Sequence, residues 1–351
     1  LNEINLNYED DFFELLPIEP LSFENIKFRI PILSTGAKEP GIGFDVKKTE
    51  EPEEALTPFD IAEQKAVKAI QKHSMNINGK ERNKKIDDAY LLLGKSRYYT
   101  ERFIPAIDAY NYIIANYPNA SLINETKIWR AKAHIRIENE ELAIETLEIL
   151  LRKPDLPDFI REDANTALAM AYTKLDSINT VRNYLWEATK TSKNKTQRAR
   201  NLFVLGQLYS LDKIKDTASI VFKKLINFKQ APYKYKIHAA IELAKNSVSD
   251  SSSLAILERY KKLIKNRDNR PYLDEIYYQV AVLEQERDSL SLAILNYNKS
   301  LRAKNGGAKQ KTYSYEQLAK IYFKNLDYVT SGAYYDSILQ VANNKNTLRI
   351  K

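Results

Sequence analysis

The sequence predicts an all-α fold in which about seven helix–turn–helix units of 37–38 residues form a superhelical solenoid behind an extended N-terminal segment. Three observations predict it. Small residues recur at a fixed spacing from about residue 87 onward, a large apolar residue stands sixteen positions after each, and successive units begin alternately 37 and 38 residues apart. A fixed period of this length indicates a repeat architecture, because unrelated amphipathic helices share no common spacing.

Residues 1–56 are predicted to be an extended acidic and aromatic segment followed by a linker, since five prolines and three glycines interrupt residues 17–52. Residues 1–26 contain seven acidic side chains and no lysine or arginine. The segment also carries the residues that we expect to bind a partner, namely Tyr8, Phe12, Phe13, Leu15, Leu16, Pro17 and Ile18. Burial of these apolar side chains would favour binding. The acidic charge of residues 1–26 favours binding to a positively charged protein surface. That surface belongs either to a partner protein, which we favour, or to the chain's own repeats.

Residues 57–79 are predicted to form a leading helix that covers the open end of the first repeat. Thr57 suits the N-cap, Pro58 suits the first helical position, and Asp60 falls near the positive end of the helix dipole. The dipeptide Asn78-Gly79 is typical of a turn that ends such a segment.

Residues 80–345 are predicted to form the repeat array, with units that start at Asp87, Asn124, Glu162, Ala199, Ile237, Asp274 and Thr312. The eighth position of each unit is small, so that the second helix can approach the first closely. These packing residues are Gly94, Ala131, Ala169, Gly206, Ala244, Ala281 and Ala319. Residues 346–351 resemble the start of a further helix, and we expect the chain to continue beyond them and to be preceded by upstream sequence.

The pattern resembles the tetratricopeptide repeat family, most clearly at Leu205-Gly206-Gln207-Leu208-Tyr209 with Ala218 and Phe222, and the resemblance covers roughly residues 87–345. It implies a groove lined by the first helix of each unit, near its fifth, ninth and twelfth positions. The groove candidates are Lys95, Ile128, Lys132, Phe203, Ile241, Lys245, Tyr278 and Lys320.

The composition argues against catalysis and against a cofactor or small-molecule substrate. There is no cysteine, and the three histidines, His73, His134 and His238, are scattered, so thiolate metal sites, cysteine nucleophiles and histidine-based triads lack their residues. Beyond residue 26 the formal charge is +15, from 54 basic and 46 − 7 = 39 acidic residues. The basic clusters recur at repeat boundaries, where solvated helix ends explain them. Without an accompanying nucleic-acid motif they predict no nucleic-acid binding.

Three segments together resemble the PorW/SprE family of tetratricopeptide lipoproteins, which belongs to the type IX secretion and gliding-motility machinery of Bacteroidota. They are Tyr8–Glu19, Lys84–Lys95 and Arg102–Ala106. The resemblance implies a non-enzymatic scaffold at the periplasmic face of the outer membrane, which links the translocon to the periplasmic ring and motor components. It also implies a lipid anchor on a cysteine upstream of this chain.

Two alternatives stay open. A generic outer-membrane tetratricopeptide lipoprotein would assist the assembly of other envelope proteins, and residues Asn116–Ala120 also resemble such barrel-assembly accessory subunits. The other alternative is a catalytic protein whose active domain lies outside this sequence.

Overall fold

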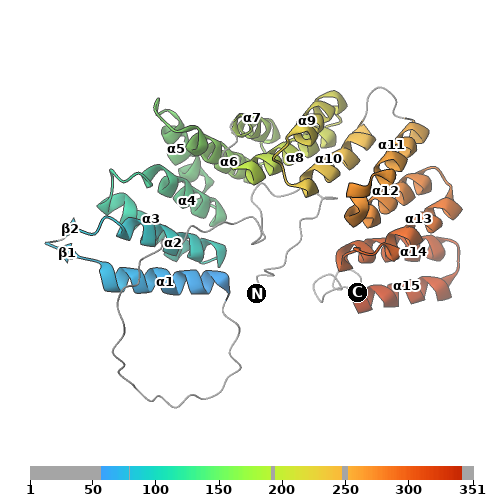
Figure 1. Ribbon diagram of the computed structural model, residues 1–351, viewed down its shortest axis with the longest axis horizontal. Coiled ribbons are helices and arrows are strands. Elements are labelled where there is room, and N and C mark those ends of the chain that lie inside the picture. The colour runs from blue at the N-terminus through green and yellow to red at the C-terminus, as the bar shows by residue number, and fades with distance from the viewer. Residues whose placement is uncertain (1–56, 79, 191–193, 247–251, 342–351) are drawn as a thin grey trace, which may run out of the picture. The chain divides into compact units, whose positions relative to one another are not determined.

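The computed structural model describes residues 57–78, 80–190, 194–246 and 252–341 of the 351-residue chain. The partner-binding candidates Tyr8–Ile18 and the predicted helix at residues 346–351 lie outside these residues. The described chain forms two compact units, one that ends at Leu205 and one that begins at Gly206. Both units are helical, as Figure 1 shows, so the all-α prediction is confirmed.

The first unit holds α1 and the first helices of the array. Their bounds are α1 (Pro58–His73), α2 (Ile86–Tyr99), α3 (Phe103–Asn116), α4 (Ile123–Arg136), α5 (Glu140–Leu151), α6 (Asp158–Lys174) and α7 (Ile178–Ala188). The helix α8 (Lys195–Leu211) contains the boundary between the units. Consecutive helices contact each other from α1 to α7, and α4 also contacts α6, so that first helices of neighbouring repeats pack together.

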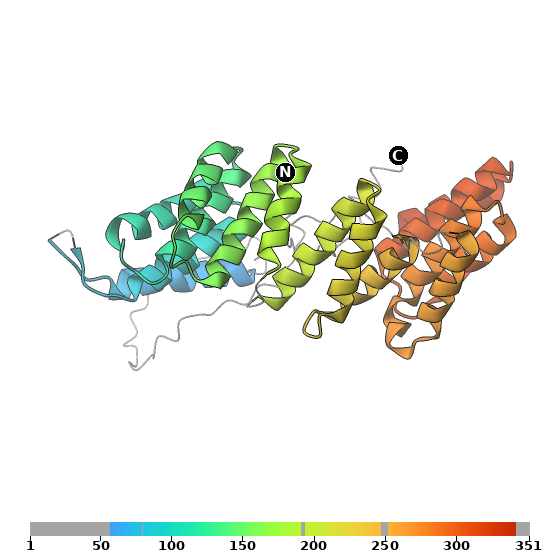
Figure 2. The same cartoon turned by 90° about the horizontal axis from the view of Figure 1, so that it is seen from above.

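The second unit continues the same alternation. Its elements are α9 (Lys215–Asn227), α10 (Tyr233–Asn246), α11 (Ser253–Lys265), the 3-10 helix η2 (Arg267–Tyr272), α12 (Leu273–Glu286), α13 (Leu290–Arg302), α14 (Ala308–Lys324) and α15 (Tyr328–Val341). Within each unit, neighbouring helices lie side by side in both views (Figures 1 and 2). In this unit α12 packs against α13, and α14 packs against α15.

The eighth position of each repeat lies inside a helix pair. Ala131 is 1% exposed and Ala319 is 0% exposed. A Cβ atom added to Gly94 would lie 2.8 Å from Cδ1 and Cζ of Tyr110, sixteen residues later. Glycine therefore allows α3 to approach α2 with a tyrosine ring between them.

The turn inside each helix pair shares one backbone conformation. In each repeat whose turn the structure describes, the fifteenth position has a positive φ, between 51° and 63°. These residues are Glu101, Glu138, Asp176, Lys213, Asp288 and Leu326. The next amide bonds back five residues, as in Arg102 N–H to the Arg97 carbonyl (2.8 Å). This is a Schellman C-cap, which usually contains glycine. None of these six positions is glycine.

The leading helix α1 begins with the predicted cap, because the Thr57 side chain and the Asp60 carboxylate form a reciprocal capping box. The helix ends at His73, earlier than the predicted segment 57–79. A two-residue antiparallel hairpin, β1 (Asn76–Ile77) and β2 (Lys80–Glu81), follows it. The Glu81 carboxylate accepts a hydrogen bond from the Met75 amide (2.8 Å). This bond holds residues 75–81 in the hairpin, and α1 therefore ends before residue 79.

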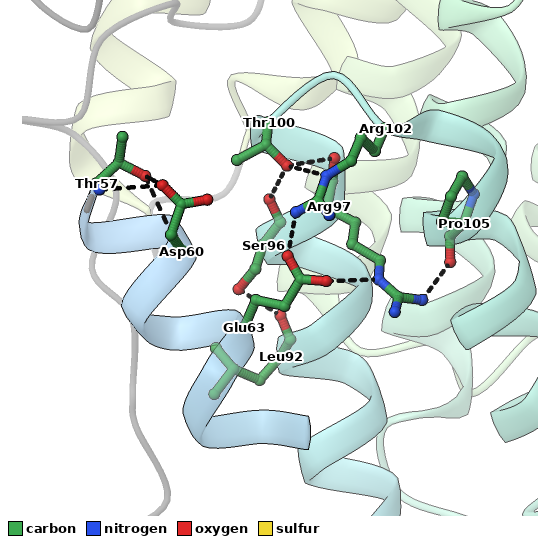
Figure 3. A network of polar contacts seen from close by, with 9 residues as sticks. All are labelled: Thr57, Asp60, Glu63, Leu92, Ser96, Arg97, Thr100, Arg102 and Pro105. Atoms are coloured by element: carbon green, nitrogen blue, oxygen red, sulfur yellow. Dashed lines mark hydrogen bonds and ion pairs between the residues drawn. The ribbon is translucent and has the colours of Figure 1, made fainter. Parts of the chain in front are cut away.

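A polar network fastens α1 to the first repeat, as Figure 3 shows. The Glu63 carboxylate accepts Nε of Arg97 at 3.0 Å and also binds the Arg102 guanidinium. Arg97 Nη1 donates in turn to the Pro105 carbonyl at 3.1 Å. Because Arg97 lies in the last turn of α2 and Pro105 in the first turn of α3, the network that starts from one carboxylate connects α1 to both helices of the first pair.

Candidate functional site

The first unit presents a basic and aromatic surface around Trp129, a half-buried residue of α4. The ammonium group of Lys95, from α2, lies 5.1 Å from the centroid of the Trp129 ring, and that of Lys132 lies 4.6 Å away. Cations are attracted to the face of an indole ring at such distances. We use the name Trp129 surface for Lys95, Phe103, Trp129, Lys132 and Arg136.

Aromatic side chains from the first pair hold this surface in place. Tyr98, which is 4% exposed, meets the Trp129 ring edge-on at 5.4 Å between centroids. Phe103, at the start of α3, contacts the other side of Tyr98 at 5.5 Å. The Arg136 guanidinium lies 5.3 Å from the Phe103 centroid. The rings of α2, α3 and α4 therefore form one packed layer, on which three cations rest.

The charge of the surface is positive. The only ion pair that the described contacts give Lys95 is with Glu125, at 2.6 Å, and their side chains are 21% and 35% exposed. Lys132 and Arg136 add two further positively charged groups to this surface. Arginine offers a planar donor fork to carboxylates, and lysine a mobile point charge. A surface of this chemistry suits an acidic segment that also carries aromatic or aliphatic side chains.

The structure divides the predicted groove residues into accessible and buried groups. It brings Lys95 and Lys132 together on the Trp129 surface. Ile128, Phe203 and Ile241 are 2%, 0% and 2% exposed, which corrects their prediction as residues that a partner reaches directly. Their apolar side chains are packed inside the folded chain, and Ile241 belongs to the core cluster of α10, α11 and α12.

The groove candidates of the second unit, Lys245, Tyr278 and Lys320, lie on three different helices, α10, α12 and α14. Lys245 pairs with Glu242 at 3.2 Å, and Lys320 pairs with Glu316 at 2.6 Å, each on its own helix. Tyr278 is half-buried, with its ring 5.6 Å from that of Tyr297. Each of these two ion pairs forms within one helix, so neither brings a second helix into a shared site.

Three residues of the Trp129 surface were not predicted from the sequence: Phe103, Trp129 and Arg136. The signal for two of them was present, since Trp129, Lys132 and Arg136 follow the i, i+3, i+7 spacing that places residues on one helical face. Phe103 comes from α3, in the preceding helix pair, and only packing brings it to Trp129.

The three histidines lie on three different helices, α1, α4 and α10. Burial, with Arg130 nearby, lowers the pKa of His134, which keeps its ring neutral on α4. His238 is 4% exposed, and its Nε2 pairs with the Glu275 carboxylate. No cluster of three or more histidine, aspartate or glutamate side chains suited to a metal ion occurs among the described residues.

A buried carboxyl group lies beside this histidine pair. Asp274 is 4% exposed, and burial together with the neighbouring Glu275 charge raises its pKa to about 6. A carboxyl group in such a position makes the stability of the second unit depend on pH.

Of the helices in the described ranges, none has the length and apolar character that crossing a bilayer requires.

No protein-family model matches this chain, and no curated protein matches it either. Several solved structures are similar to it at low identity. They include Pseudomonas aeruginosa PilF, at 14% identity over 65% of this chain and 96% of that one (TM-score 0.43). The C-terminal part of a TPR repeat-containing protein from Cytophaga hutchinsonii is 16% identical over 84% and 95% of the two chains (TM-score 0.41). The human IFIT1 dimer with m7Gppp-AAAA is 13% identical over 82% and 68% (TM-score 0.42).

The helix pairs themselves define the class of the described chain. First and second helices alternate from α2 to α15, with a small residue at the eighth position and a shared turn conformation at the fifteenth. The described chain is an all-α array of tetratricopeptide-type helix pairs, an architecture that offers extended surfaces to protein partners.

Proposed function

We propose that this chain is a non-enzymatic scaffold that binds protein partners in the type IX secretion machinery. In this proposal it sits at the periplasmic face of the outer membrane, held by a lipid anchor upstream of residue 1. It links the outer-membrane translocon to the periplasmic ring and motor components. The Trp129 surface is the observation that carries the binding role, and the resemblance of Tyr8–Glu19, Lys84–Lys95 and Arg102–Ala106 to the PorW/SprE family supports the choice of system.

The chemistry of the Trp129 surface supports protein binding. Tryptophan and arginine are enriched among residues whose truncation costs most at protein interfaces. Trp129 is held by Tyr98 and Tyr99, with ring centroids 5.4 Å and 5.6 Å away, so little side-chain entropy is lost when a partner covers it. The surrounding cations select a partner segment that is acidic.

The proposal is tested by crosslinking in the native host, followed by affinity purification of the full chain. We expect translocon subunits and periplasmic ring lipoproteins to be recovered. Lys132→Glu should reduce their recovery, because reversal of a charge that contacts a carboxylate weakens binding by about tenfold or more. Lys320→Glu is the matched control, since Lys320 occupies the same ninth position in the last repeat.

Two results would contradict the proposal. Recovery of barrel-assembly subunits in place of secretion subunits would favour the alternative of an assembly accessory protein, which the sequence of Asn116–Ala120 resembles. Equal recovery of secretion subunits with Lys132→Glu and wild type would show that the partner binds elsewhere on the chain.

A further inference from the structure

We propose that residues Tyr8–Ile18 of this same chain bind the Trp129 surface, so that the N-terminal segment occupies the site a partner has to use. The inference rests on the proposed role of the Trp129 surface as a protein-binding site, and it names the first occupant of that site. It makes the segment an autoinhibitory element, which an acidic partner segment displaces.

The chemistry of the two surfaces is complementary. Residues 1–26 carry seven carboxylates and no basic side chain, and residues 8–18 interleave them with Tyr8, Phe12 and Phe13. The Trp129 surface offers three cations over a layer of rings. Carboxylates of the segment bind the cations, and its rings pack at the edges of Trp129, where aromatic pairs are favoured.

The covalent connection places the segment within reach. Residues 19–56, that is 56 − 18 = 38 positions, separate Ile18 from Thr57. Thr57 caps α1, and the Glu63 pair with Arg97 fixes α1 on α2, the helix that carries Lys95 (Figure 3). A chain of this length spans at most about 130 Å when extended, so the segment reaches any part of α2, α3 and α4.

The connection also favours binding within one molecule. A tethered segment meets its site at an effective concentration on the order of millimolar. Even weak intrinsic affinity then fills the site before a partner at micromolar concentration does. The apparent affinity of that partner falls in proportion to the fraction of sites left open. Partner binding and release of the segment are therefore coupled.

The first test uses tryptophan emission of the full chain. The sequence contains two tryptophans, so Trp186→Phe leaves Trp129 as the single reporter. In this background, Phe12→Ala with Phe13→Ala should shift Trp129 emission to longer wavelength and increase its quenching by acrylamide. The control is Phe28→Ala with Phe44→Ala, which removes two phenylalanines of the same N-terminal region from outside residues 8–18 and should leave Trp129 unchanged.

High salt should also shift Trp129 emission to longer wavelength and increase its quenching, because it weakens the attraction between the carboxylates and the cations. Raising the ionic strength from about 0.1 M to about 1 M shortens the screening length from about 10 Å to about 3 Å. Unchanged Trp129 quenching in the Phe12 and Phe13 variant would overturn the proposal. Circular dichroism of each variant shows whether the repeats stay folded. A variant that unfolds is replaced by Glu14→Lys with Asp11→Lys, which reverses two charges and keeps both phenylalanines.

The second test locates the segment directly. Phe12→p-benzoylphenylalanine in the full chain, after irradiation, should give crosslinks within the monomer to residues of α2 or α4 around Trp129. Crosslinks that appear only between molecules, or only to the second unit, would overturn the proposal. The outcome is separable from the proposed function: if Lys132→Glu abolishes partner recovery while this crosslink is absent, the surface binds partners but the segment is not its occupant.

Discussion

Substitution of Gly206 by alanine should destabilise the helix pair formed by α8 and α9, although alanine is the better helix former. An added Cβ would lie 2.7 Å from Cζ of Phe222, and the Phe222 ring is fully buried. Overpacking of this kind costs about 1–3 kcal/mol, against a gain of about 1 kcal/mol in helix propensity. The expected net loss is therefore up to about 2 kcal/mol.

Two companion variants make this reasoning specific. Gly332, in α15, has no atom within 4 Å of an added Cβ, so Gly332→Ala should stabilise by about 0.5–1 kcal/mol. Leucine stands sixteen residues after alanine at Ala131 and Ala169. Phe222→Leu should accordingly reverse the sign of the Gly206→Ala effect, so that alanine becomes stabilising in the double variant.

The assay is urea unfolding followed by circular dichroism, with hydrogen exchange of α9 amides to locate the change. Local exchange is needed because the chain has two compact units, so one transition need not describe both. If Gly206→Ala stabilises the protein as Gly332→Ala does, or if Phe222→Leu leaves its effect unchanged, the contact between the eighth position and the residue sixteen later is not what fixes the pair.

Three further predictions concern the turns, the leading helix and pH. Leu326→Gly should raise the free energy of unfolding by about 1 kcal/mol, because Leu326 has a φ of 63° and its side chain is 72% exposed. The control is Asn325→Gly, at a negative φ, which should lower the free energy of unfolding in the same urea assay. Glu63→Gln should weaken the docking of α1 by about 1–2 kcal/mol, seen as faster amide exchange in α1, while the exposed Gln64→Ala should not. Asp274 has a folded-state pKa of about 6, above the usual value for aspartate, so the folded protein holds this proton more tightly than the unfolded chain. Stability should fall by about 2–3 kcal/mol as pH rises from about 4 to about 7, and Asp274→Asn should remove that fall in thermal unfolding measured across this range.

The repeat architecture was predictable because side-chain size varies along the sequence with the period of the repeat. Small residues such as Gly94 and large ones such as Tyr110 must alternate at a fixed spacing for two helices to approach, and that constraint is visible in one sequence. The turns were not predictable, because no glycine marks their left-handed residues. Lys213 and Leu326 adopt the positive φ that glycine usually adopts at this position of a helix C-cap.

The candidate surface was predictable only in part. Lys95 and Lys132 share a repeat position that the family resemblance associates with the groove. Their convergence on Trp129 depends on how α2 and α4 pack, which no spacing within one helix reveals. Ile128 fails as an accessible groove residue for the same reason: it lies one turn before Lys132 on α4, yet packing leaves it only 2% exposed.

The most direct test of the scaffold role is quantitative recovery of secretion-machinery subunits with the full chain after crosslinking in the native host, compared among wild type, Lys132→Glu and Lys320→Glu. The Trp129 surface predicts that Lys132→Glu lowers recovery by about tenfold, while Lys320→Glu recovers as much as wild type. Equal recovery from all three proteins, each shown to be folded by circular dichroism, would contradict the account.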